Sequence, residues 1–231
     1  MSDSLNSESR LDIAEFLRSF TPARVDLRRA GASPSTTERL RFNADHALAR
    51  DAVKRPLDVV RLTSELKGIG VETVLVHSMA ATLEDHLIRP DLGRRLLPED
   101  RIALFRPVQT SFVVADGLSA GAVVRYAPRL LSALGGASRV VAVKHGRVAI
   151  GDEIGEAQEA SLSVVLIGER PGLSAAESMG VYVTYSPRVG RTDAERWCIS
   201  NIRDDGTTPE IAAEQLRSMM NRAESERRTG V

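Results

Sequence analysis

Four short apolar runs constrain the fold of this chain more than any other feature of its sequence. They cover residues Thr73–His77, Ser111–Ala115, Val140–Lys144 and Leu162–Ile167. None of them alternates polar with apolar residues, and such runs are typical of strands that are covered on both faces, as in parallel sheets. The runs therefore predict a buried and mostly parallel β-sheet.

Segments with a helical pattern separate these runs, notably 118–134 and roughly 151–160. A helical stripe over 59–69 precedes the first run, a fifth strand is expected at Val181–Tyr185, and a last helix at about 209–224. Strands that alternate with helices predict an α/β domain with a Rossmann-like, mostly parallel, doubly wound sheet.

The first part of the chain has a different pattern. Ile13, Phe16, Leu17 and Phe20 recur at the spacing of one helix face, which predicts a short helix there. A second helix is expected to begin at Ser35, with Glu38 completing a capping box, and to end before Pro56. We therefore divide the chain into an N-terminal helical region, residues 1–56, and an α/β domain, residues 57–231.

The charge balance excludes several classes of partner. The 31 basic and 31 acidic side chains give a formal net charge of zero, so the chain has no electrostatic attraction to nucleic acid or to an anionic membrane. No stretch approaches 18 apolar residues, and the N-terminus does not resemble a signal peptide. Cys198 is the single cysteine, which favours a reducing, cytoplasmic location.

Carboxylates lie beside glycines where three of the predicted strands end. The segments are VVADGLSA at 113–120, HGRVAIGDEIGE at 145–156 and GERPGLS at 168–174. In open α/β sheets, ligands bind outside the carboxyl ends of the strands, so these segments are candidates for a site. The alternative is structural: Asp116 would cap the helix that follows it, and Glu169 would satisfy a turn.

Other common sites have no support in the sequence. Neither a phosphate-binding loop nor a G-x-G-x-x-G motif is present. Asp152 and Glu153 have no His or Cys at metal-ligand spacing, and the four histidines are scattered. A lone cysteine such as Cys198 is most often a small buried apolar residue. These residues therefore predict a ligand site at the strand ends and leave its chemistry open.

Seven segments, in order, give the chain a resemblance to the small subunit of ethanolamine ammonia-lyase. Between residues 20 and 203 they are FTPARVDLRRAG (20–31), RPDLGRRL (89–96), VVADGLSA (113–120), GDEIGE (151–156), LIGERPGLS (166–174), TYSPR (184–188) and GRTDAERWCISNIR (190–203). The C-terminal SERRTGV departs from the usual ending of that family.

The resemblance implies an enzyme that converts ethanolamine to acetaldehyde and ammonia by a radical mechanism, with adenosylcobalamin as cofactor. It implies a hetero-oligomer in which the large subunit holds the substrate and the small subunit, inactive alone, contacts the cofactor at the interface. The cofactor-contacting positions of the family match Val148, Glu169 and Cys198, and no residue is matched as catalytic or as a metal ligand. Whether a bacterial microcompartment encloses the enzyme stays open.

Two other interpretations compete with this one. The chain could be a non-catalytic scaffold subunit of Rossmann-like fold without cofactor contact, which the intact GERPG and CISNI segments argue against. It could also be an independent nucleotide-dependent enzyme, which the missing phosphate-binding loops argue against. A cofactor-contacting enzyme subunit is therefore the expectation to be tested.

Overall fold

The computed structural model describes residues 33–230, together with residues 13, 16, 17, 19, 20, 29 and 30. Of the helix predicted from Ile13 to Phe20, residues 13, 16, 17 and 19 are helical, and residues 14, 15 and 18 lie outside the described residues. Short paired segments, β1 (Arg29–Ala30) and β2 (Ser33–Pro34), precede the first long helix. Among the described residues, no helix has both the length and the apolar character needed to cross a membrane.

The core of the molecule is a six-stranded mixed sheet with the strand order β3-β5-β4-β6-β7-β8. The bounds are β3 (Glu72–His77), β4 (Thr110–Ala115), β5 (Arg139–Lys144), β6 (Leu162–Gly168), β7 (Met179–Tyr185) and β8 (Trp197–Ile202). The first four strands of that order are parallel, and β7 and β8 are added antiparallel at one side. The predicted α/β class and mostly parallel sheet are thus confirmed.

The strand order does not follow the usual Rossmann order. Numbered along the chain, these strands lie in the order 1-3-2-4-5-6, because β5 is inserted between β3 and β4. The usual order is 3-2-1-4-5-6. The Rossmann-like, doubly wound part of the prediction therefore remains a prediction.

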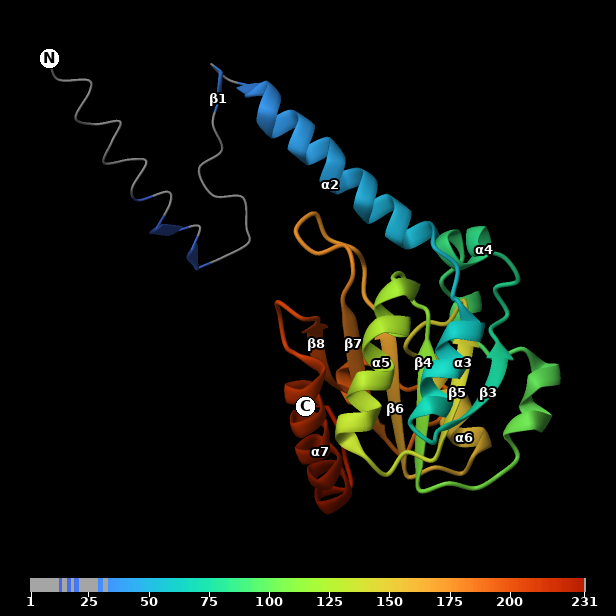
Figure 1. The fold of residues 1–231 in the computed structure, drawn as a ribbon. Coiled ribbons are helices and arrows are strands. Elements are labelled where there is room, and N and C mark those ends of the chain that lie inside the picture. Colours follow the sequence, from blue (N-terminus) through green and yellow to red (C-terminus); the bar gives the residue numbers. More distant parts are fainter. Residues whose placement is uncertain (1–12, 14–15, 18, 21–28, 31–32, 231) are drawn as a thin grey trace, which may run out of the picture.

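Helices lie on both faces of the sheet (Figure 1). One face packs against α3 (Val59–Gly68), α5 (Ala120–Leu134) and α7 (Pro209–Glu226). The other face packs against α6 (Ile150–Ala157) and the 3₁₀ segment η2 (Pro98–Leu104). The short elements α4 (Leu83–Ile88), η1 (Leu92–Arg94) and η3 (Asp193–Glu195) complete the connections.

Burial on both faces explains the apolar runs. Every residue of β6 is buried, and its side chains alternate between the two cores. Val164 and Leu166 pack with the α3–α5–α7 side, whereas Val165 and Ile167 pack with α6. Because neither face of such a strand is exposed to water, its residues do not alternate between polar and apolar, and the sequence of the strand is a continuous apolar run.

The helix α2 (Thr36–Lys54) extends away from the sheet (Figure 1). The side chain of Ser35 caps it by accepting a hydrogen bond from the Glu38 N–H at 3.3 Å, but the return bond from the Ser35 N–H to the Glu38 side chain, which would complete the predicted capping box, is not formed. The helix ends before Pro56, as predicted. Ala52 is its one buried residue, and Leu40 and Leu48 are exposed. The proposed domain boundary after residue 56 is compatible with this sparse contact and stays a prediction.

Candidate functional site

The ends of three parallel strands form one groove at the carboxyl edge of the sheet. β4, β5 and β6 are neighbours in parallel register, so the segments that follow them meet at the same edge. The groove has a volume of about 370 Å³. Its lining residues are Gly117, Leu118, Arg147, Val148, Ile167, Gly168, Glu169, Arg170 and Tyr182. The predicted strand-end segments are therefore brought together.

Two glycines allow the loops after β4 and β6 to cross. The Leu118 N–H donates to the Gly168 carbonyl at 3.0 Å. A Cβ at Gly117, whose φ is +56°, would lie 2.2 Å from that carbonyl oxygen, and a Cβ at Gly168 would lie 2.4 Å from the Asp116 carbonyl oxygen. Only glycine fits at both positions. These glycines permit contact between two loops, and thereby shape the groove floor.

Asp116 does not cap α5, contrary to the structural alternative. Its carboxylate accepts hydrogen bonds from the His145 N–H at 2.7 Å and the Gly146 N–H at 2.9 Å. It is buried, and burial raises the pKa of Asp116, whereas these backbone bonds act in the opposite direction. Asp116 therefore fixes the loop after β5, which carries Arg147 and Val148 to the groove.

His86 of α4 lies behind the groove and connects the same two loops. Its Nδ1 is 2.9 Å from the His145 carbonyl oxygen and its Nε2 is 2.6 Å from the Gly117 carbonyl oxygen. His86 is almost completely buried. With both ring nitrogens engaged by backbone carbonyls, this imidazole has no lone pair directed at a ligand. His86 is thus a positioning residue of the groove.

Glu169, the predicted cofactor contact after β6, is half-buried and lines the groove. Its carboxylate accepts a hydrogen bond from the Ser178 hydroxyl at 2.7 Å and from the Asn201 N–H at 3.1 Å. It therefore joins the ends of β6 and β8 to the start of β7. A carboxylate has about four acceptor positions, so Glu169 keeps capacity for one further donor.

Val148 and Cys198 are each related to the groove residue Tyr182. Val148 lines the groove and packs on the core beside α6. Cys198 does not line it, but it pairs directly with Tyr182 across β7 and β8. Burial raises the pKa of the Tyr182 hydroxyl. The three predicted contacts thus lie around one side chain, which the strand-end argument did not single out.

The expectation of a buried cysteine is wrong. The Cys198 side chain is exposed, because α6 covers β4 and β6 and leaves this face of β7 and β8 open. The neighbouring strand still removes some water from the thiol, which raises the pKa of Cys198. Cys198 therefore lies on an open sheet face beside the groove, where an outside molecule can contact it.

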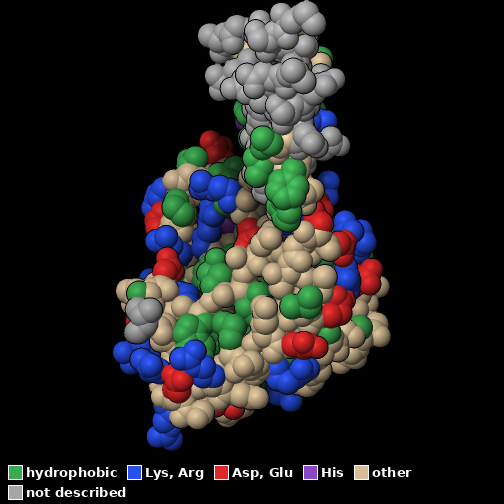
Figure 2. Space-filling model, turned by 90° about the vertical axis from the view of Figure 1, so that its left-hand side faces the viewer, with side chains coloured by type: hydrophobic (Ala, Val, Ile, Leu, Met, Phe, Trp, Pro, Cys, Tyr) green, Lys and Arg blue, Asp and Glu red, His purple; other side chains and the backbone are tan. Residues whose placement is uncertain are grey.

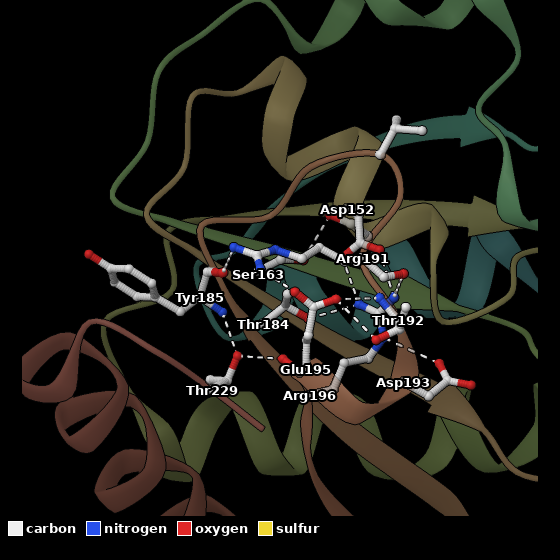
Figure 3. Close-up of polar contacts among 12 residues, drawn as sticks. Asp152, Ser163, Thr184, Tyr185, Arg191, Thr192, Asp193, Glu195, Arg196 and Thr229 are labelled. Carbon is white, nitrogen blue, oxygen red and sulfur yellow. Dashed lines mark hydrogen bonds and ion pairs between the residues drawn. The ribbon is translucent and has the colours of Figure 1, made fainter. Parts of the chain in front are cut away.

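A buried ion pair holds the strand of Cys198 to the helix that follows Val148 (Figure 3). Arg196 donates to both oxygens of Asp152 at 2.7 Å, and it also donates to the Thr184 hydroxyl at 3.0 Å. Burial raises the pKa of Asp152, and the bonds from Arg196 act against that rise. Asp152, a residue considered for metal binding, is thus part of a structural contact.

The groove also contains two arginines that were not predicted as site residues from the sequence. Arg147 and Arg170 line it, and they lie within the strand-end segments HGRVA and GERPG. Arg147 directly follows Gly146 and Arg170 directly follows Glu169, so their places in the strand-end segments could have identified them as candidates. Among the described residues, no group of three or more His, Cys, Asp or Glu side chains could hold a metal ion.

The fold and this edge define an α/β protein with a polar groove at its strand ends and an open sheet face beside it. A family model described as ethanolamine ammonia-lyase light chain (EutC) matches residues 11–231. The chain belongs to this family. The ethanolamine ammonia-lyase small subunit of Ralstonia nicotianae is 45% identical over 93% of this chain and 85% of its own length. That of Bradyrhizobium diazoefficiens is 46% identical over 93% and 87%.

Proposed function

We propose that this chain is the small subunit of an adenosylcobalamin-dependent ethanolamine ammonia-lyase, and that it forms one wall of the cofactor site. The enzyme would convert ethanolamine to acetaldehyde and ammonia, with the substrate held by a large subunit. The observation that carries the proposal is the convergence of Val148, Glu169 and Cys198 from three separate segments around Tyr182. Family membership supports the reaction.

The size and openness of the groove fit a shared cofactor site. Pockets that enclose drug-sized ligands have volumes of about 300–1,000 Å³. A cobalamin is larger than such ligands, and the groove measures about 370 Å³. The groove could hold only part of a cobalamin, while the open face of β7 and β8 could lie along another part. A second protein surface would have to cover the remainder, which is the role we assign to the large subunit.

The side chains around the groove suit the periphery of a cobalamin. Val148 would pack on the apolar edge of the corrin, and Glu169 would accept a hydrogen bond from an amide or hydroxyl group. Cys198 would add a small, polarizable contact. Bound adenosylcobalamin supplies the radical chemistry by homolysis of its cobalt–carbon bond. Because both ring nitrogens of His86 are engaged by the chain, no cobalt ligand is expected from that residue.

If the large subunit holds the substrate and covers the rest of the cofactor, this chain should be inactive alone and should bind the cofactor only weakly. The test is gel filtration with absorbance detection of the corrin, on this chain, on the large subunit and on their mixture. We expect the corrin to co-elute with protein, and ammonia to be released from ethanolamine, only when both chains are present. Turnover by the isolated chain would contradict the proposal. A two-chain complex that turns over substrate with unchanged cofactor affinity in Val148→Asp and Glu169→Ala would favour the scaffold alternative.

A further inference from the structure

Among the described residues, the arginine side chains at the groove form no ion pair with a carboxylate. Arg147 and Arg170 line it, and Arg94 lies close enough for its charge to act on Arg147. Figure 2 shows Lys and Arg side chains gathered at this end of the domain, near the base of α2. In a chain of zero formal net charge, a local concentration of positive charge requires an explanation.

The neighbouring carboxylates form no ion pair with this cluster, although the charge of Asp116 acts on Arg147. Asp116 accepts two backbone N–H groups, and Glu169 accepts from Ser178 and Asn201. Within the described residues, Arg94 and Arg170 have neither an ion pair nor a side-chain hydrogen bond, whereas Arg95 and Arg196 each pair with a carboxylate. Three arginines against two carboxylates, Asp116 and Glu169, therefore leave an excess of one positive charge around the groove.

Arg147 is the best-placed member of the cluster. One of its terminal nitrogens donates to the His86 carbonyl oxygen at 2.6 Å, which fixes the guanidinium. Its Nε is buried and has no hydrogen-bond partner among the described residues. A buried donor without a partner is unfavourable, so a ligand that supplied an acceptor to this guanidinium would be bound favourably.

We propose that Arg147 and Arg170 form an anion subsite of the groove and bind a phosphodiester group of the ligand, with Arg94 adding to the positive field. The planar fork of arginine matches phosphate oxygens and is the usual choice for this group. The inference rests on the proposed function, because the nucleotide loop of adenosylcobalamin carries one phosphodiester. It assigns that end of the cofactor to the groove and the corrin edge to the region of Val148 and Cys198.

The test compares two ligands on the assembled two-chain enzyme. Adenosylcobinamide lacks the nucleotide loop and hence the phosphodiester, but it keeps the corrin and the adenosyl group. Arg170→Gln should weaken binding of adenosylcobalamin about tenfold to a hundredfold, the scale of a lost charged hydrogen bond, and leave adenosylcobinamide binding unchanged. Affinities are read from the corrin absorbance, without turnover. Arg170 is exposed and forms no ion pair or side-chain hydrogen bond with the described residues, so the variant should fold.

Arg106→Gln is the matched control, because Arg106 is exposed and precedes β4 at the opposite edge of the sheet. It should change neither affinity. Unchanged adenosylcobalamin affinity in Arg170→Gln, or an equal loss for both ligands, would overturn the anion subsite. Weaker subunit association with unchanged cofactor affinity would also overturn it, and would assign these arginines to carboxylates of the partner. A wild-type complex that binds neither ligand would instead contradict the proposed function.

Discussion

Tyr182 and Cys198 show how one pair of opposed residues can build a contact surface. Because they pair across β7 and β8, both side chains point to the same open face of the sheet. Gly180 precedes Tyr182 by two residues on that face, and a Cβ there would approach Glu169 Oε1 to 3.1 Å. The small residue thus leaves room for Glu169 beside the Tyr182 ring. This surface has the Glu169 carboxylate at one end and the polarizable Cys198 sulfur at the other.

Labelling of Cys198 tests whether this surface meets the cofactor. Cys198 is the single cysteine of the chain, so mass spectrometry of this chain reports on one site. We expect a maleimide to label it in the two-chain complex without cofactor, faster at higher pH because the thiolate reacts and the pKa is raised. Adenosylcobalamin should protect it. Cys198→Ser should fold and lose about 1 kcal/mol of cofactor binding. Equal labelling rates with and without cofactor would show that Cys198 lies outside the cofactor contact.

Side-chain roles were the least predictable part of the site. The sequence indicated that Asp116 and Glu169 follow strands, and the structure places both at one edge. It did not indicate that Asp116 binds the backbone 29 and 30 residues further along the chain. Which backbone groups Asp116 can reach depends on the order of the strands in the sheet. In this sheet β5 lies between β3 and β4, which differs from the usual Rossmann order. Local patterns can predict a strand end, but they contain no information about the neighbour it meets.

Among the elements, the strands with continuous apolar runs were the easiest to predict. β3 to β7 were all expected, with ends within about two residues of the observed ones. The edge strand β3 is partly exposed, yet its run from Val74 to Val76 is apolar throughout. β8 was not expected, because Cys198, Ser200 and Asn201 are exposed. Its polar face interrupts the apolar run that marked the other strands. The position of β8 depends instead on tertiary contacts, above all the ion pair of Arg196.

Removal of Arg196 should destabilise the attachment of β8 to α6. Arg196→Met leaves the Asp152 carboxylate buried without its cation, which costs about 3–5 kcal/mol. We expect a loss of that size in the free energy of unfolding, measured by urea denaturation. Arg61→Met breaks an exposed i,i+4 pair with Glu65 and should change stability by about 0.5 kcal/mol or less. The double variant Asp152→Leu, Arg196→Met should recover part of the loss, since no charge is then buried alone. A loss below about 1 kcal/mol in Arg196→Met would mean that β8 is held by its apolar contacts.

For the whole molecule, the main asymmetry is between the buried sheet and the projecting helix α2. Most of the sheet is covered by helices, and most of its large apolar side chains are enclosed, although one face of β7 and β8 is open. By contrast, Leu40 and Leu48 of α2 are 64% and 61% exposed. Exposed apolar side chains on a projecting helix are suited to contact with another protein. We therefore expect α2 to contribute to assembly, whereas the groove lies within residues 57–231.

The division at residue 56 predicts that residues 57–231 fold without the N-terminal region. The truncated chain loses the burial of Ala52 and the exposed ion pair between Arg55 and Glu177. Together these contribute about 1–2 kcal/mol, because one methyl group is worth about 0.8 kcal/mol and an exposed ion pair at most about 1. In a domain of this size the midpoint of thermal unfolding should fall by about 2–8 °C, with the transition still cooperative.

Full-length Leu48→Ser, a change at an exposed position, should leave the midpoint unchanged. Circular dichroism follows both transitions, and gel filtration with the large subunit shows whether the truncated chain still assembles. A truncated chain without a cooperative transition would show that α2 belongs to the folding unit and that the boundary is wrong.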